Sequence, residues 1–173
     1  MESWYSFVPK VIPLLGGDYY WNSLIIGALD DCSRSGIHLA IFNEPYLSYL
    51  LDGKKTVESR FGVKRCAPYG KVAPGDIVFL KKSSGPIVGI CTVSDVWFYA
   101  LNKKSWNKIR TEFSLALCAQ DPDFWLKREA AMFATLMQIG KVKSIDPVDF
   151  AKKDRRGWVV LRSTINSFAG MYL

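Results

Sequence analysis

The sequence predicts an α+β fold in which a small mixed β-barrel is flanked by helices. Runs rich in β-branched and aromatic residues, separated by turns and by one short helix at residues 44–52, are typical of barrel strands; they lie at 38–42, 56–61, 76–81 and 87–99. Apolar residues at helical spacing predict flanking helices at 18–34, 105–118 and 122–131. A chain of 173 residues, of which 49% are hydrophobic and 14% aromatic, can bury such a core.

We expect residues 1–36 to form a helical extension packed on the barrel, and residues 37–173 to form the barrel domain. The segment begins with an apolar, proline-interrupted stretch. Asp18 is a plausible N-cap for the first helix, and Gly36 a natural terminator. The aromatic extension could instead be exposed and bind a protein partner, which would make the molecule an interaction adaptor.

The second half of the chain is expected to add two helices and two strands. Ser105 can cap the first helix, and Asp121-Pro122 can start the second, because proline is well tolerated in a first helical turn. Residues 133–145 predict a strand, although 130–136 could instead extend the helix. Residues 158–161 predict the last barrel strand, and Gly89 predicts a bulge or a close backbone approach.

The segment from Gly53 to Arg60 combines a lysine, a carboxylate and an arginine within a few positions. Side chains alternate along a strand, so Val57 should face the core while Glu58 and Arg60 share a polar face. Lys55 lies at the corner before the strand, from which it could reach that polar face. The alternative is an ordinary surface ion pair between Glu58 and Arg60, which is worth about 0–1 kcal/mol.

This segment also matches a known pattern. The run Gly53-Lys54-Lys55-Thr56-Val57-Glu58-Ser59-Arg60 follows a helix opened by Glu44-Pro45 and precedes Gly75-Asp76-Ile77-Val78. It closely resembles the signature of the ASCH domain, a family within the PUA-like superfamily of small β-barrels. The resemblance extends from about His38 to Leu161. It implies the barrel fold, and it implies that hydrolysis is possible, because the family looks to include amide hydrolases of acylated cytidine and nuclease-like members.

Charge favours a polyanionic partner. The formal net charge is +7 and the isoelectric point is near 9.2, and clustered Lys and Arg are typical of nucleic-acid binding. We therefore expect RNA or another single-stranded nucleic acid, or a nucleotide-like small molecule, to bind in a basic cleft beside the segment. In that cleft cations would hold phosphates, Glu58 would accept a hydrogen bond from an exocyclic amine, and tryptophans would stack on bases. The expected binding residues are Lys55, Glu58, Arg60, Lys64, Arg65, Trp97, Lys127, Arg128, Arg155, Arg156 and Trp158.

The alternative function is a hydrolase acting on RNA or on a modified nucleoside. Lys55 would serve as a base or stabilise a developing oxyanion, and Glu58 would be the general acid or base. The hydroxyl of Tyr49 could reach the same cleft. The amidohydrolases that the segment resembles place a threonine three residues after the lysine, where this chain has Glu58, and this departure weakens an acyl-transfer mechanism.

Other classes of function are disfavoured. The four cysteines, at 32, 66, 91 and 118, lack the spacing of a zinc site or of a disulfide framework, so no metal or cofactor is expected. The single histidine, His38, opens a strand and is expected to be structural. Free thiols and the absence of a signal-peptide pattern predict a cytoplasmic protein. Apolar runs far below the ~20 residues of a membrane span predict no membrane association, and we expect a monomer or a weak dimer.

Overall fold

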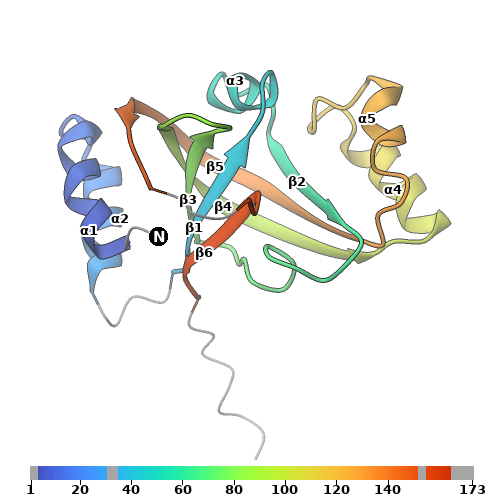
Figure 1. Ribbon diagram of the computed structural model, residues 1–173, viewed down its shortest axis with the longest axis horizontal. Helices are drawn as coiled ribbons and strands as arrows, with labels where there is room; N and C mark the ends of the chain where they lie inside the picture. The colour runs from blue at the N-terminus through green and yellow to red at the C-terminus, as the bar shows by residue number, and fades with distance from the viewer. Residues whose placement is uncertain (1–3, 31–34, 152–154, 165–173) are drawn as a thin grey trace, which may run out of the picture.

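The computed structural model describes residues 4–30, 35–151 and 155–164 of the chain. It contains one mixed six-stranded sheet, with helices at both of its ends (Figure 1). In chain order the elements are α1 (Trp4–Val11), a 3-10 turn (Ile12–Leu15), α2 (Tyr19–Leu29), β1 (Ile37–Phe42), α3 (Tyr46–Leu51), β2 (Val57–Gly62), β3 (Ile77–Lys82), β4 (Ile87–Ala100), α4 (Lys103–Phe113), α5 (Pro122–Leu126), β5 (Phe133–Val148) and β6 (Trp158–Arg162).

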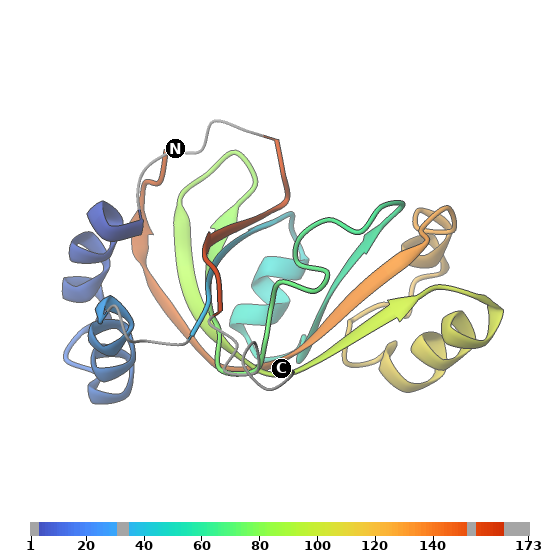
Figure 2. The same cartoon turned by 90° about the horizontal axis from the view of Figure 1, so that it is seen from below.

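The sheet is strongly curled, and its strand order is β2-β5-β4-β3-β1-β6. β1 and β3 pair in parallel, whereas the other neighbouring strands are antiparallel. The curl makes a half-barrel with β2 and β6 as its two edge strands (Figure 2). The predicted α+β barrel flanked by helices is therefore confirmed.

The two longest strands, β4 and β5, form an antiparallel pair that runs from one end of the molecule to the other (Figure 1). At one end, Ile87 and Ile145 belong to a core shared with α1 and α2. At the other end, Leu136 belongs to a core shared with α4 and α5. A third core, which includes Leu50 from α3 and Cys91 from β4, fills the inside of the curl between them. Burial raises the pKa of the Cys91 thiol far above its usual range, as expected for an inert free cysteine.

Side chains alternate along β1 and β3, so each of these strands contributes residues to two of the cores. Ile37 and Leu39 on β1 join Phe79 in the core under the N-terminal helices, while Ala40 and Leu80 point to the inside of the curl. The predicted close approach at Gly89 is confirmed, because a Cβ atom built there would lie 2.7 Å from the Leu51 side chain and 3.2 Å from the Lys143 carbonyl oxygen. The register of β4 against β5 also shifts beside Gly89.

The N-terminal segment contains one helix more than the helix predicted at 18–34. Residues 4–11 form this helix, α1, with Pro9 inside it. Phe7 and Val8 are fully buried against the sheet, and such packing stabilises a short helix regardless of propensity. Asp18 is the N-cap of α2, as predicted, and accepts a hydrogen bond from the Trp21 amide at 3.3 Å. The helix ends at Leu29 rather than near residue 34, and residues 31–34 lie outside the described residues.

The later helices are shorter than predicted. Asn102, not Ser105, is the N-cap of α4, and the two side chains form a reciprocal capping box. α4 ends at Phe113, and the chain continues as turns that carry buried Leu117. α5 starts as predicted, with Asp121 as its N-cap, but ends at Leu126. Residues 133–148 are strand throughout, so the helical alternative for 130–136 is wrong.

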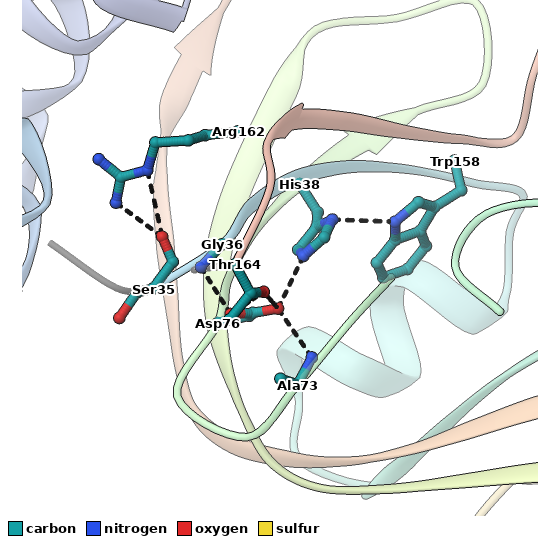
Figure 3. Close-up of polar contacts among 8 residues, drawn as sticks. All are labelled: Ser35, Gly36, His38, Ala73, Asp76, Trp158, Arg162 and Thr164. Atoms are coloured by element: carbon teal, nitrogen blue, oxygen red, sulfur yellow. Dashed lines mark hydrogen bonds and ion pairs between the residues drawn. The ribbon is translucent and has the colours of Figure 1, made fainter. Parts of the chain in front are cut away.

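A buried carboxylate ties the start of β1 to the end of β6 (Figure 3). Asp76 accepts hydrogen bonds from the amides of Gly36 and Ala73 and from the Thr164 hydroxyl, and His38 Nε2 lies 2.9 Å from it. Because Trp158 Nε1 donates to His38 Nδ1 at 3.3 Å, the proton of the imidazole is on Nε2 and is donated to Asp76. His38 therefore has the structural role predicted for it, and it fixes Trp158 behind the candidate site.

Candidate functional site

A cavity of about 200 Å³ opens beside β2, between the end of β1, the start of α3 and α5. Its walls combine aromatic rings with charged groups from four separate stretches of the chain. The lining residues are Ile41, Phe42, Asn43, Tyr46, Lys55, Glu58, Ser59, Arg60, Phe124 and Arg128. The structure thus brings together four residues of the predicted site, namely Lys55, Glu58, Arg60 and Arg128.

Strand alternation places the carboxylate of this cavity. Val57 packs into the core beneath α4 and α5, whereas Glu58 and Arg60 point to the other face of β2 and line the cavity. Glu58 is 6% exposed, and its two oxygens lie 3.3 Å from Lys55 Nζ and 2.9 Å from Arg60 Nε. The pair is therefore not an ordinary surface ion pair. A carboxylate offers about four acceptor positions, so Glu58 retains acceptor capacity toward the cavity.

The ammonium group of Lys55 is fully engaged. It donates to the carbonyl oxygens of Val57 at 2.8 Å and Leu117 at 3.2 Å, and it pairs with Glu58. These contacts account for the three N–H donors of a lysine. The side chain is 3% exposed and lies 5.7 Å from the centre of the Tyr46 ring. In this arrangement Lys55 positions Glu58 and joins β2 to the turn that follows α4.

Arg60 connects β2 with the other side of the curl. Its terminal nitrogens donate to the Ile41 carbonyl on β1 and to the Gly157 carbonyl just before β6, both at 3.0 Å. The guanidinium also lies over the rings of Phe42 at 4.9 Å and Trp158 at 5.4 Å. These contacts hold Arg60 in a fixed place, where it orients the carboxylate of Glu58.

Arg128 brings unused donors to the cavity. Its side chain is half-buried, with its guanidinium 3.7 Å from the centre of the Phe124 ring. Burial lowers the pKa of Arg128, and the nearby charge of Glu58 partly opposes that shift. One terminal nitrogen donates to the Phe124 carbonyl at 2.6 Å. A guanidinium has five N–H donors, so several remain for a ligand in the cavity.

The other predicted binding residues lie in different places. Arg155 and Arg156 line a neighbouring cavity of about 390 Å³. Lys64 lines a small cavity of about 30 Å³ near Phe61. Arg65 lies over the Phe133 ring at 5.0 Å, and exposed Lys127 pairs with Asp123.

Two predicted tryptophans and a tyrosine are occupied by packing. Trp97 contacts Phe113 in the core beneath α4, and Trp158 is buried behind Arg60. Tyr49 packs against Tyr46 and Lys54 and does not line the cavity. Tyr46, one helical turn earlier, lines it instead.

Sequence reasoning missed Tyr46, Asn43 and Phe124 as lining residues. Tyr46 and Tyr49 are three positions apart, so they share a helix face and the periodicity could not separate them. Tyr46 at the start of α3 and Phe124 on α5 reach the cavity only through the tertiary fold. Within the described residues, no group of three or more His, Cys, Asp or Glu side chains is placed to hold a metal ion. Likewise, none of the helices described there is both long and apolar enough to span a bilayer.

Neither a scan against protein-family models nor a search of curated proteins finds a match for this chain. Solved structures do match it. The crystal structure of ASCH from Zymomonas mobilis aligns with a TM-score of 0.60 at 14% identity, covering 75% of this chain and 90% of that one. A serine-to-alanine mutant of the protein aligns with a TM-score of 0.60 at 12% identity and the same coverage. A tyrosine-to-phenylalanine mutant gives 0.58 at 12% identity, covering 73% and 90%. The chain therefore has an ASCH-like, PUA-like α+β fold, in agreement with the resemblance of its sequence.

Proposed function

We propose that this ASCH-like domain binds single-stranded nucleic acid, with RNA as the leading ligand, by taking one base into the cavity beside β2. The observation that carries the proposal is that Glu58 and Arg128 line the same cavity. One presents free acceptor positions and the other free donors. The volume of about 200 Å³ is below the roughly 300–1,000 Å³ of pockets for drug-sized ligands, so a single base suits it better than a larger molecule.

The lining chemistry fits an unstacked base. Glu58 would accept a hydrogen bond from an exocyclic amine or a ring N–H, and Arg128 would donate to a base carbonyl or a phosphate oxygen. The rings of Tyr46 and Phe124 supply apolar and aromatic surface, and stacking of a base on an aromatic ring is worth about 1–3 kcal/mol. The net charge of +7 would attract the phosphate backbone.

Fluorescence anisotropy with a labelled, mixed-sequence single-stranded RNA tests this function. We expect Glu58→Gln and Arg128→Met each to weaken binding by at least about tenfold, since a hydrogen bond to a charged group contributes roughly 1.5–3 kcal/mol. Lys104→Met, an exposed cation on α4, is the matched control and should bind as the wild type does. Equal affinity of all three variants and the wild type would place binding elsewhere on the molecule. DNA of the same sequence measures the contribution of the ribose 2′-hydroxyls.

Hydrolysis of the bound ligand is the second candidate, because a nearly buried carboxylate and a guanidinium face the same cavity. Glu58 would act as general acid or base, and Arg128 would stabilise developing negative charge. Lys55 would position Glu58 in this scheme, since its three donors are engaged. RNA recovered from the titration and separated on a gel distinguishes the two functions. Intact RNA after long incubation favours binding, whereas fragments that are absent with Glu58→Gln favour hydrolysis.

A further inference from the structure

A second, more basic cavity adjoins the candidate site. Its volume is about 390 Å³, and it lies between the turn joining β3 to β4 and the segment that precedes β6. Two lysines, Lys81 and Lys82, come from the first wall, and two arginines, Arg155 and Arg156, come from the second. The hydroxyl-bearing Ser83 and Ser84 complete the first wall, and none of the described residues that line the cavity is acidic.

The two cavities share a wall. Ile41 lines both, and Gly157 of the second cavity accepts a hydrogen bond from Arg60 of the first. A Cβ atom on residue 157 would lie 3.2 Å from that arginine's terminal nitrogen, so the backbone between the cavities is closely packed. The two cavities therefore lie side by side, with Ile41 and the Arg60–Gly157 contact between them.

We infer that the second cavity binds the phosphate groups of the nucleotides next to the base held in the first cavity. This inference rests on the proposed function and adds a path for the nucleic-acid chain across β1 and β6. Two lysines and two arginines around one hollow give it a positive potential, which attracts a polyanion. Arginine forks and serine hydroxyls are suitable donors to phosphate oxygens, whereas a planar base would find no aromatic ring among the described lining residues. Of these cations, Lys82 has only a weak, half-exposed pairing with Glu44 at 3.9 Å.

The test measures the binding of monophosphates and of RNA to variants with substitutions in each wall of the cavity. The ligands are the common ribonucleoside monophosphates and a short mixed-sequence single-stranded RNA. The variants are Arg155→Ala with Arg156→Ala, and separately Lys82→Ala. The control is Lys103→Ala with Lys104→Ala, which removes the same charge from the exposed start of α4.

We expect the arginine double variant to lower RNA affinity by about tenfold or more and to leave monophosphate affinity unchanged. Each lost phosphate contact should reduce the slope of log affinity against log salt by roughly 0.7, so the double variant should lose about 1.4. Lys82→Ala should show a smaller loss of the same kind from the opposite wall. The control should keep the wild-type slope apart from a small general effect of charge.

The outcomes separate the inference from the function on which it rests. If the wild type binds RNA and Glu58→Gln weakens that binding, but the arginine variant matches the lysine control, the phosphate path is wrong and the base site stands. A wild type that binds the single-stranded RNA no more tightly than a monophosphate also overturns the path. If the wild type binds neither ligand, the proposed function and the path fail together.

Discussion

Lys55 is the residue whose role changes most between sequence and structure. In the sequence it reads as a cation beside a polar face, available to a phosphate or to a reaction. In the structure it is nearly buried, and its ammonium group satisfies two backbone carbonyls and one carboxylate. Removing one partner from a buried pair leaves the other charge without compensation, and this is more costly than losing an exposed pair.

Lys55→Met should lower the free energy of unfolding by roughly 1–3 kcal/mol, because two buried carbonyl groups lose their donor while Arg60 still pairs with Glu58. Equilibrium urea unfolding measures the change. The neighbouring Lys54→Met removes an exposed ammonium that pairs with Asp52 at 3.6 Å, and its effect should stay within about 0.5 kcal/mol. Equal midpoints for the two variants would mean that Lys55 contributes no more than a surface lysine.

At the scale of the element, local chemistry in the sequence marks where helices start more reliably than where they end. Asp18 and Asp121 are recognisable as caps, since a short acidic side chain can accept from the free amides of a first turn. The helix ends were missed because burial determines them. In α4, for example, the apolar stripe continues to Leu117, although the helix ends at Phe113 and the chain goes on as turns.

Asp18→Ala should lower the melting temperature by a few degrees at neutral pH. Hydrogen bonds from Lys143 and from the Trp21 amide hold the pKa of Asp18 below its usual value of 3.8. A lowered pKa stabilises the fold above the unfolded-state value, and that contribution is lost as the pH falls through the lowered pKa. The difference between wild type and variant should therefore be constant above about pH 5 and vanish in stronger acid. Asp146→Ala, an exposed carboxylate on β5, is the control and should show no such difference.

Strand alternation in the sequence is sufficient to predict that Glu58 and Arg60 share one face of β2. It is sufficient because the period of a strand depends on the backbone alone. Two other lining residues, Phe124 and Arg128, come from α5 and the turn after it, which lie far from β2 in the sequence, and no local pattern records that meeting. The predicted roles of the aromatic residues were wrong for a related reason. A tryptophan such as Trp158 looks the same in a sequence whether it will stack on a ligand or be buried behind an arginine.

At the scale of the whole molecule, the N-terminal helices are part of the fold. Phe7 on α1 lies edge-on to Phe79 on β3 and to Phe150, with ring centres 5.2 and 5.0 Å apart. It belongs to a core that includes strands β1, β3 and β4. Of the aromatic residues in this arm, Trp4, Phe7 and Trp21 are buried, whereas Tyr5, Tyr19 and Tyr20 are exposed.

Phe7→Ala should reduce the free energy of unfolding by about 3–5 kcal/mol, as removal of a fully buried phenylalanine does when the cavity cannot collapse. Tyr5→Ala, at a side chain that is 53% exposed on the same helix, should change it by much less. Both variants are compared with the wild type by urea unfolding. A small effect of Phe7→Ala, similar to that of Tyr5→Ala, would show that α1 contributes little to stability.

We expect Arg60 to influence how quickly the domain admits a ligand. Among the described strands β2 and β6 are the two edges of the sheet, and no backbone ladder joins them. The bonds that cross from β2 to β1 and to the segment before β6 come from the Arg60 guanidinium. Parting them requires the movement of one side chain, and not the separation of paired strands. We therefore expect association in a single kinetic phase, with a rate proportional to ligand concentration and no slow opening step.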